Sequence, residues 1–178
     1  MSENLPKATP VAQGPQVDMR VLMAANQAGV RLEVVGGLPL WEVSPAARHQ
    51  KAVYRIQASI APARDREGQC GCFSLADTYV RFPDGSLKRP DIAVFCQEPP
   101  DTDEAVTLLP EAVIEVISAG YEAKDLEIGA YFYLAQGVKD VVVFDPRTLW
   151  VLHMRRDSTR RLTSPVEIDL ECGCRCQV

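Results

Sequence analysis

The stretch "PEAVIEVISAGYEAKDLEIGAYFYLAQGVKDVVVFDP", residues 110–146, decides the fold class. Residues 112–118 form a nearly continuous apolar run, which is typical of a strand buried on both faces. A helical pattern over 121–138 ends at Gly137, and a second apolar strand over 140–146 closes with a Pro turn. Strand–helix–strand connections in one sheet are right-handed and make a parallel pair. The stretch therefore predicts an α/β (α+β) fold, a mixed sheet with helices packed on it.

The flanking sequence predicts further elements of the same sheet. We expect a helix over 17–29, a hairpin over 30–44 around Gly36-Gly37, and a helix over 44–63 that Ser44 caps. Two strands within 70–95 should be joined by a turn at 83–85, and a surface loop should follow over 96–105. A strand over 148–156 should pair with the segment around Leu162 or with 166–170.

Length and composition favour one domain. The chain has 178 residues, which suits a lead-in over 1–16 and a single domain over 17–178. No apolar stretch is long enough to span a membrane, and the lead-in has no basic start or apolar core, so we expect a cytoplasmic protein without a signal peptide. The net charge of −5 argues against a broad basic surface for nucleic acid but not against a local groove. The basic segment "HMRRDSTRRL", residues 153–162, is expected to be a solvated strand pair and turn.

Six cysteines form an unusual pattern, with "CGC" at 70–72, a lone Cys96, and "CGCRC" at 172–176. In a cytoplasmic chain we expect them to be thiols. Zinc sites usually space their ligands C-x2–4-C, so the pattern favours small apolar strand residues or a frayed terminus over a metal site, which stays open as the lesser alternative.

Two carboxylates lie in apolar strands, where an unpaired charge is costly. Asp91 heads the run "RPDIAVF" (89–95), and Glu115 lies inside "PEAVIEVIS" (110–118). On adjacent strands of a parallel arrangement the two could bind Mg²⁺ or Mn²⁺, which prefer oxygen ligands. In the alternative, Asp91 caps a turn after Pro90 and Glu115 pairs with a neighbouring Lys or Arg.

An ordered set of motifs resembles a known family. The set is "RLEVVGGLPLWEVSPAARHQ" at 31–50, "RPDIAVF", "PEAVIEVIS", Asp125, Tyr133, the Gly-Val pair at 137–138 and the Asp-Pro pair at 145–146. Over about 30–155 it resembles the Uma-type restriction endonuclease family of the PD-(D/E)xK nuclease superfamily, which is common in bacteria. The resemblance implies a restriction-endonuclease-like fold and a Mg²⁺- or Mn²⁺-dependent DNA endonuclease that hydrolyses phosphodiester bonds with metal-activated water.

The resemblance also implies roles for single residues. Glu33, Asp91 and Glu115 match the metal ligands, and His49 matches a catalytic position at the start of the second helix. Asp125 and Tyr133 match positions on the helix behind the site. The plainer alternatives are a solvent-facing residue for His49, a charge favouring the helix dipole for Asp125, and a core aromatic for Tyr133.

The sequence departs from the family at the catalytic lysine. The superfamily position is Ile117, and the position on the following helix where the family carries its lysine is Gly129. Lys124 is the nearest substitute, about 140° away from Gly129 around a helix.

Three hypotheses follow. The first is an active DNA endonuclease assisted by Lys124. The second is a catalytically impaired nuclease-fold protein that acts as a binding or assembly module. The third is a small-molecule-binding protein of unrelated class. By analogy with nucleases that cut both strands, a homodimer is possible.

Overall fold

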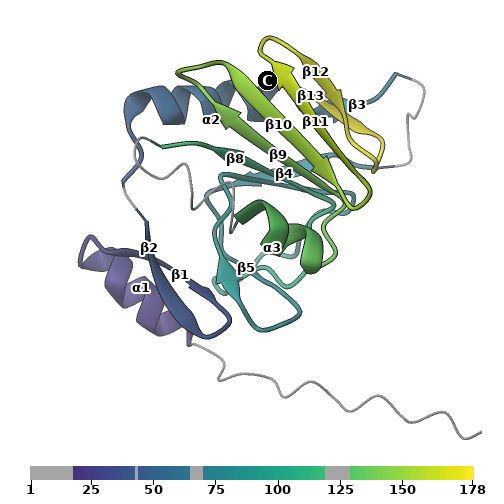
Figure 1. Cartoon of the computed structure of the whole chain (residues 1–178). Helices are drawn as coiled ribbons and strands as arrows, with labels where there is room; N and C mark the ends of the chain where they lie inside the picture. Colours follow the sequence, from purple (N-terminus) through teal and green to yellow (C-terminus); the bar gives the residue numbers. More distant parts are fainter. Residues whose placement is uncertain (1–17, 43, 65–69, 119–128) are drawn as a thin grey trace, which may run out of the picture.

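The computed structural model describes residues 18–42, 44–64, 70–118 and 129–178. A six-stranded sheet forms the centre of the molecule (Figure 1). Its strands, in spatial order, are β11 (Ser158–Thr163), β10 (Trp150–Arg155), β9 (Asp140–Asp145), β8 (Ala112–Val116), β7 (Ile92–Phe95) and β4 (Phe73–Ala76). The mixed α+β fold expected from the sequence is confirmed.

The central strands pair as the apolar runs predict, with one correction. β8 and β9 are parallel, as expected for the strand–helix–strand stretch. β7 and β8 are adjacent but antiparallel, with Ile92 opposite Ile114, so the expected parallel arrangement of the two carboxylate-bearing strands is wrong. A connection of 16 residues between the two strands is long enough for a crossover, but it holds no helix among the elements described, and the chain simply returns alongside β7.

Both faces of the sheet are covered, which explains why β8 is apolar almost throughout. Ala112, Ile114 and Val116 point to the face that packs on α2 (Ala47–Ser59) and the C-terminal strands. Val113 points to the opposite face, which packs on α3 (Ala130–Ala135). Alternation along one strand thus supplies two separate cores.

A second sheet lies beside the first and carries the N-terminal elements. Its order is β2 (Leu38–Glu42), β1 (Arg31–Val35), β6 (Leu87–Lys88) and β5 (Val80–Arg81). The hairpin of β1 and β2 turns at Gly36 and Gly37, whose φ angles of +56° and +83° suit glycine. Helix α1 (Met19–Gln27) begins at its N-cap Asp18, and α1, β1 and β2 lie at one end of the molecule (Figure 1).

The second predicted helix is shorter than expected. α2 has Ala46 at its N-cap with no capping side chain, so the proposed Ser44 cap is wrong. It ends at Ser59 because the next residues form β3 (Ala61–Pro62), which pairs with β13 (Cys174–Gln177). The third sheet has the order β12 (Glu167–Asp169), β13 and β3.

Of the remaining predicted strands and turns, some are confirmed and others are wrong. Four short strands, β4 to β7, replace the two strands expected within 70–95, and the turn at 83–85 joins β5 to β6. The basic hairpin of β10 and β11 is confirmed, whereas 166–170 pairs with β13 instead. The described end of α3 is followed by Gly137 at φ +100°, as its position predicts.

The cysteines are not all thiols, contrary to the expectation. Disulfides join Cys70 to Cys96 and Cys72 to Cys174, while Cys172 and Cys176 are not bonded. The terminus is not frayed either, because Cys176 is buried in the core and burial raises the pKa of its thiol to about 12. Among the helices of the described ranges, none has the length and apolar character needed to cross a membrane.

Candidate functional site

Asp91 and Glu115 meet at one end of the β7–β8 pair. Ile92 lies opposite Ile114, so Asp91, one residue before β7, comes next to Glu115 on β8. The backbone N–H of Asp91 donates to Oε2 of Glu115 at 3.2 Å. Both residues are partly exposed, unlike the buried apolar residues around them. The antiparallel register, rather than a parallel one, therefore brings the two carboxylates together.

Asp91 is held by two further groups. Its Oδ2 accepts a hydrogen bond from the backbone N–H of Val116 at 2.7 Å and lies 3.0 Å from Nε2 of His49. His49 projects from the first turn of α2 and is only 7% exposed, so the solvent-facing alternative for this histidine is wrong. Asp91 does not simply cap a local turn, because its side chain reaches across to β8.

Tyr133 supports Glu115 from the helix behind the sheet. The Tyr133 hydroxyl on α3 donates to Oε1 of Glu115 at 2.5 Å. Burial of the ring and the nearby charge of Glu115 hold the pKa of Tyr133 well above its ordinary value. The phenol is therefore a neutral hydrogen-bond donor to the carboxylate of Glu115. Tyr133 belongs to the core, as the plainer alternative has it, and also contacts the site.

Glu33 is almost fully buried, at 1% exposed. Its Oε1 accepts from the backbone N–H of Arg89 at 2.8 Å, and its Oε2 accepts from Nζ of Lys88 at 3.1 Å. The Lys88 nitrogen also lies 4.9 Å from the centroid of the Tyr133 ring, within range of a cation–π interaction. The charge of Glu33 contributes to the raised pKa of Tyr133, after burial and Glu115.

The acidic residues thus form two linked groups rather than one cage. One group is Asp91, Glu115 and His49, and the other is Glu33 with Lys88. Tyr133 contacts a member of each group, Glu115 through its hydroxyl and Lys88 through its ring. Within the described ranges, sets of three or more Cys, His, Asp or Glu ligand atoms that all lie within 4.8 Å of one another consist of cysteines. Convergence of three carboxylates on one point is therefore not preformed.

The oxygen donors at the site still suit a hard divalent cation. Mg²⁺ is usually bound through one or two carboxylates and keeps several waters, which matches the adjacent, partly exposed carboxylates of Asp91 and Glu115. Glu33 is the weaker candidate ligand, because it is almost fully buried and its Oε2 is paired with the ammonium of Lys88.

A buried lysine near the site, Lys88, is a feature that sequence reasoning missed. Lys124 and Asp125 lie outside the described residues, and Gly129 is buried at the N-terminus of α3. Lys88, only 4% exposed, lies three residues before Asp91 in the chain. A lysine inside a short strand, next to the Arg-Pro-Asp motif, was the signal that could have identified it.

Comparison with known proteins gives the family. Residues 18–171 match the family model Uma2, described as "Putative restriction endonuclease". The chain belongs to the Uma2 family.

A solved structure shares the fold of this Uma2 protein. It carries the description "Crystal structure of a putative nuclease belonging to DUF820 from Anabaena variabilis", is 18% identical, and matches with a TM-score of 0.59 over 78% of this chain and 80% of that chain. No curated protein matches the chain. Family membership thus indicates a nuclease of the restriction endonuclease type, and the fold agrees with it.

Proposed function

We propose that this Uma2 protein is a Mg²⁺- or Mn²⁺-dependent DNA endonuclease that hydrolyses phosphodiester bonds. The observation that carries the proposal is the adjacency of Asp91 and Glu115 at the end of two buried strands. Each carboxylate is oriented by a second group, His49 for Asp91 and Tyr133 for Glu115. If Glu115 served only in an ion pair with a Lys or Arg, a second carboxylate next to it would not be needed.

Asp91 and Glu115 would hold the cation, and Glu33 would join them if its carboxylate exchanged its contact with Lys88. A divalent ion at such a site supplies an activated water and stabilises the charge that develops on the phosphate. The protein residues then have a simple task, which is to hold two charged carboxylates close together. The N–H groups of Asp91 and Val116 offset part of their mutual repulsion by donating to them.

Lys88 would supply the positive charge that Gly129 cannot. Its ammonium lies beside Tyr133, whose hydroxyl contacts Glu115, so it is close to the proposed cation site. The positive charge of the Lys88 ammonium would stabilise negative charge on the phosphate and help to orient the attacking water. Lys124, outside the described residues, remains a second candidate for this role. His49 would act as the residue that orients the charged carboxylate of Asp91.

The exposed face of α2 offers a path for the DNA backbone. Arg48, Lys51 and Arg55 follow one another at helical spacing and are exposed. They line a cavity of about 410 Å³. The stripe begins one residue before His49, so DNA bound along it would pass close to the proposed site. Local basic charge of this kind resolves the conflict between a net charge of −5 and a polyanionic substrate.

The second candidate function is a catalytically impaired nuclease-fold protein that binds or assembles without cutting. The observation in its favour is Gly129, which leaves the family's lysine position without a side chain. Both functions would operate in the cytoplasm, where DNA is accessible in a bacterial cell. Cleavage of both strands would further require two copies of the chain, so we propose a homodimer for the active form.

A plasmid cleavage assay separates the two functions. Supercoiled DNA is incubated with the wild-type chain in Mg²⁺, Mn²⁺ or EDTA, and with Asp91→Asn and Glu115→Gln. We expect metal-dependent nicking by the wild type and none by either variant. Asp101→Asn, in an exposed loop, is the matched control and should cut normally. Absence of cleavage by the wild type, with DNA binding retained, would favour the binding module. Cleavage by both active-site variants would contradict the proposal.

A further inference from the structure

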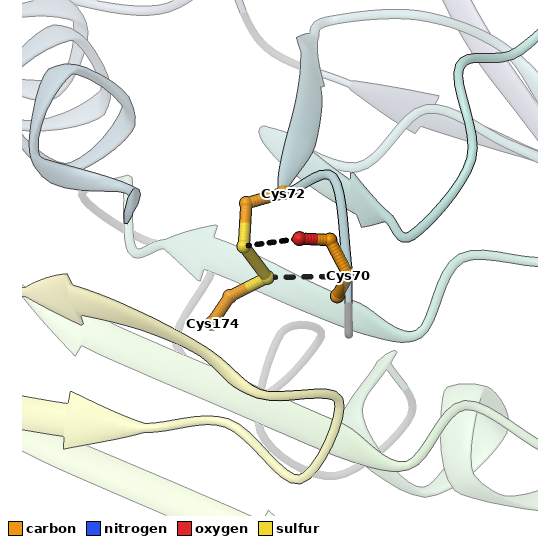
Figure 2. A group of neighbouring side chains, drawn as sticks. All are labelled: Cys70, Cys72 and Cys174. Atoms are coloured by element: carbon orange, nitrogen blue, oxygen red, sulfur yellow. Dashed lines mark hydrogen bonds between the residues drawn. A yellow bond between two sulfur atoms is a disulfide. The ribbon is translucent and has the colours of Figure 1, made fainter. Parts of the chain in front are cut away.

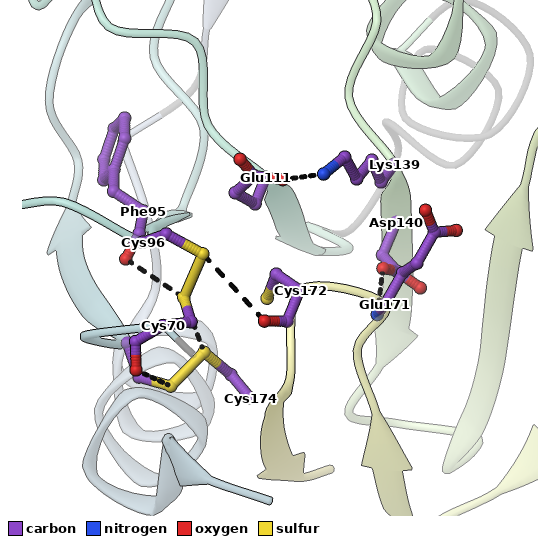
Figure 3. The surroundings of a disulfide bond; sticks show 10 residues. Cys70, Phe95, Cys96, Glu111, Lys139, Asp140, Glu171, Cys172 and Cys174 are labelled. Atoms are coloured by element: carbon purple, nitrogen blue, oxygen red, sulfur yellow. Dashed lines mark hydrogen bonds and ion pairs between the residues drawn. A yellow bond between two sulfur atoms is a disulfide. The ribbon is translucent and has the colours of Figure 1, made fainter. Parts of the chain in front are cut away.

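Five of the six cysteines gather at one place, which does not include Asp91 or Glu115. The disulfide Cys72–Cys174 lies next to Cys70, and Sγ of Cys174 is 3.3 Å from Sγ of Cys70 (Figure 2). Cys70 is in turn bonded to Cys96 (Figure 3). Cys172 lies beside the second disulfide (Figure 3), and its ligand atom is within 4.8 Å of those of Cys70 and Cys96. We call this group the cysteine cluster.

The spacing of the sulfur atoms suits one tetrahedral metal ion. Zn–S bonds of about 2.3 Å in a tetrahedron put neighbouring sulfurs about 3.8 Å apart. The ligand atoms of Cys70, Cys72 and Cys174 all lie within 4.8 Å of one another, which is slightly more than this spacing. The sulfurs of Cys70 and Cys174 are 3.3 Å apart, which is slightly less. Three of the four sulfurs are therefore close to the required spacing. Cys96 shares no group of this spacing with Cys72 or Cys174, so its side chain must rotate toward them once its bond to Cys70 is reduced.

The backbone around the cysteine cluster is built for close approach. The first Cys-Gly-Cys turn carries two of the sulfurs, Cys70 and Cys72, and the second carries Cys174. A Cβ at Gly71 would come within 2.3 Å of the Phe73 ring and 2.9 Å of the Cys96 carbonyl oxygen, so this position must be glycine. Gly173 has φ +92°, a conformation that other residues rarely adopt. The N–H of Gly71 also donates to the carbonyl of Cys96 at 2.9 Å, which fixes the first turn against the end of β7.

Burial indicates a structural rather than a catalytic site. Cys174 is 0% exposed and Cys70 is 6% exposed, so four sulfur ligands would leave a bound ion little access to substrate. Closed four-cysteine sites of this kind hold zinc for stability, and soft thiolate ligands exclude Mg²⁺ and Ca²⁺. The ligands also come from three separate segments of the chain, so an ion would tie β13 to the central sheet.

We propose that Cys70, Cys72, Cys96 and Cys174, when reduced, bind one Zn²⁺ in a tetrahedral structural site. Cys172 remains beside this site as an unbound thiol. Cys96 and Cys172 both lie within 4.8 Å of Cys70, and Cys96 is preferred as the fourth ligand because reduction of its disulfide releases a thiol directly beside Cys70. The site is independent of the proposed nuclease function and persists if that function is wrong.

The disulfides and the zinc site are two states of the same four sulfurs. Two molecules of a dithiol reductant supply four electrons and four protons, break both disulfides, and leave as two cyclic disulfides. The four cysteine thiols then lose four protons as one Zn²⁺ binds, which leaves a site charge of −2. Such reductants keep cytoplasmic thiols reduced.

Cobalt substitution tests the proposal on the full chain. The protein is reduced with a phosphine under anaerobic conditions, desalted, and titrated with Co²⁺, whose visible absorption reports tetrahedral thiolate ligation. We expect saturation at one Co²⁺ per chain and displacement of the cobalt spectrum by one equivalent of Zn²⁺. The zinc-loaded protein should also protect four thiols from alkylation and melt at a higher temperature than the reduced metal-free protein.

Single substitutions identify the ligands and supply the control. Cys72→Ser and Cys96→Ser should lose the tetrahedral spectrum or weaken Co²⁺ binding at least tenfold. Cys176→Ala, a buried thiol on the same strand as Cys174, and Cys172→Ser should keep full stoichiometry. Failure of the reduced wild type to bind Co²⁺ would overturn the proposal. Loss of binding in Cys172→Ser with retention in Cys96→Ser would overturn the proposed ligand set.

Discussion

At the scale of single residues, the proposed cleavage is expected to depend on Lys88. Its ammonium is buried between Glu33 and the ring of Tyr133. We expect Lys88→Met to lower the rate of DNA cleavage by about 10²-fold or more, by analogy with loss of one donor to a charged transition state. The measurement is the cleavage rate of Lys88→Met and of the wild type at saturating DNA.

Stability must be controlled in that experiment, because Lys88→Met leaves Glu33 buried without its ion pair. Loss of one partner of a buried pair costs about 3–5 kcal/mol. The double variant Glu33→Gln, Lys88→Met removes both charges and should recover most of that loss in a urea unfolding curve. If cleavage recovered together with stability, Lys88 would have only a structural role.

Tyr133 gives a second prediction at the same scale. Tyr133→Phe removes the hydroxyl that donates to Glu115 at 2.5 Å and leaves the ring packing unchanged. Hydrogen bonds to charged groups contribute about 1.5–3 kcal/mol. We expect the free energy of unfolding to fall by an amount in this range, measured by urea denaturation. Tyr131→Phe, on the exposed side of α3, is the control and should change little.

The residue scale also shows where the sequence was informative about the site. The apolar runs around Asp91 and Glu115 predicted two buried strands, with one carboxylate at the head of its run and the other inside its run, and the structure places those carboxylates together. The ion pair of Glu33 with Lys88 joins β1 to β6, two strands of the N-terminal sheet. Pairing between short strands depends on tertiary packing, so no local pattern predicts it.

At the scale of elements, β9, β10 and the turn before β13 are joined by one buried carboxylate. Asp140 is 0% exposed, and its oxygens contact His153 Nε2 at 2.7 Å, Arg155 Nε at 2.6 Å and the backbone N–H of Glu171 at 2.7 Å. Burial alone would raise the pKa of Asp140, but the hydrogen bonds from His153 and Arg155 outweigh it and lower the pKa below the ordinary value.

This carboxylate makes stability depend on pH in a known direction. Because the pKa of Asp140 is lower in the folded state, its charge contributes stability above the ordinary value of 3.8 and that contribution is lost as the pH falls through the folded-state pKa. We expect Asp140→Asn to be clearly less stable than the wild type at pH 7 and the difference to shrink below about pH 4. Urea unfolding at several pH values measures it, and a constant difference would contradict the account.

Element prediction succeeded where patterns were long and failed where strands were short. The strand–helix–strand stretch and the hairpin at Gly36-Gly37 follow from apolar runs and glycine turns. The two-residue strands β3, β5 and β6 carry too few residues for a pattern, and the pairing of β3 with β13 shortened α2. The disulfides were missed because the expected compartment, rather than the spacing of the cysteines, governed the interpretation.

At the scale of the whole molecule, DNA binding should depend on the basic stripe of α2 rather than on net charge. We expect replacement of Arg48, Lys51 and Arg55 by alanine to weaken DNA binding and to reduce the slope of log affinity against log salt by up to about three. Fluorescence anisotropy over a salt series measures both effects. The same number of substitutions at Arg160, Arg161 and Arg156, on the β10–β11 hairpin, provides a charge-matched control. An equal effect there would mean that charge acts without regard to position.

The claim on which the proposed function depends is that Asp91 and Glu115 together bind one divalent cation. Calorimetric titration of Mn²⁺ into the metal-free chain tests it without DNA or turnover. We predict one Mn²⁺ per chain at this site, with binding lost or weakened at least tenfold in both Asp91→Asn and Glu115→Gln and retained in Asp101→Asn. Unchanged Mn²⁺ binding in the first two variants would contradict the claim.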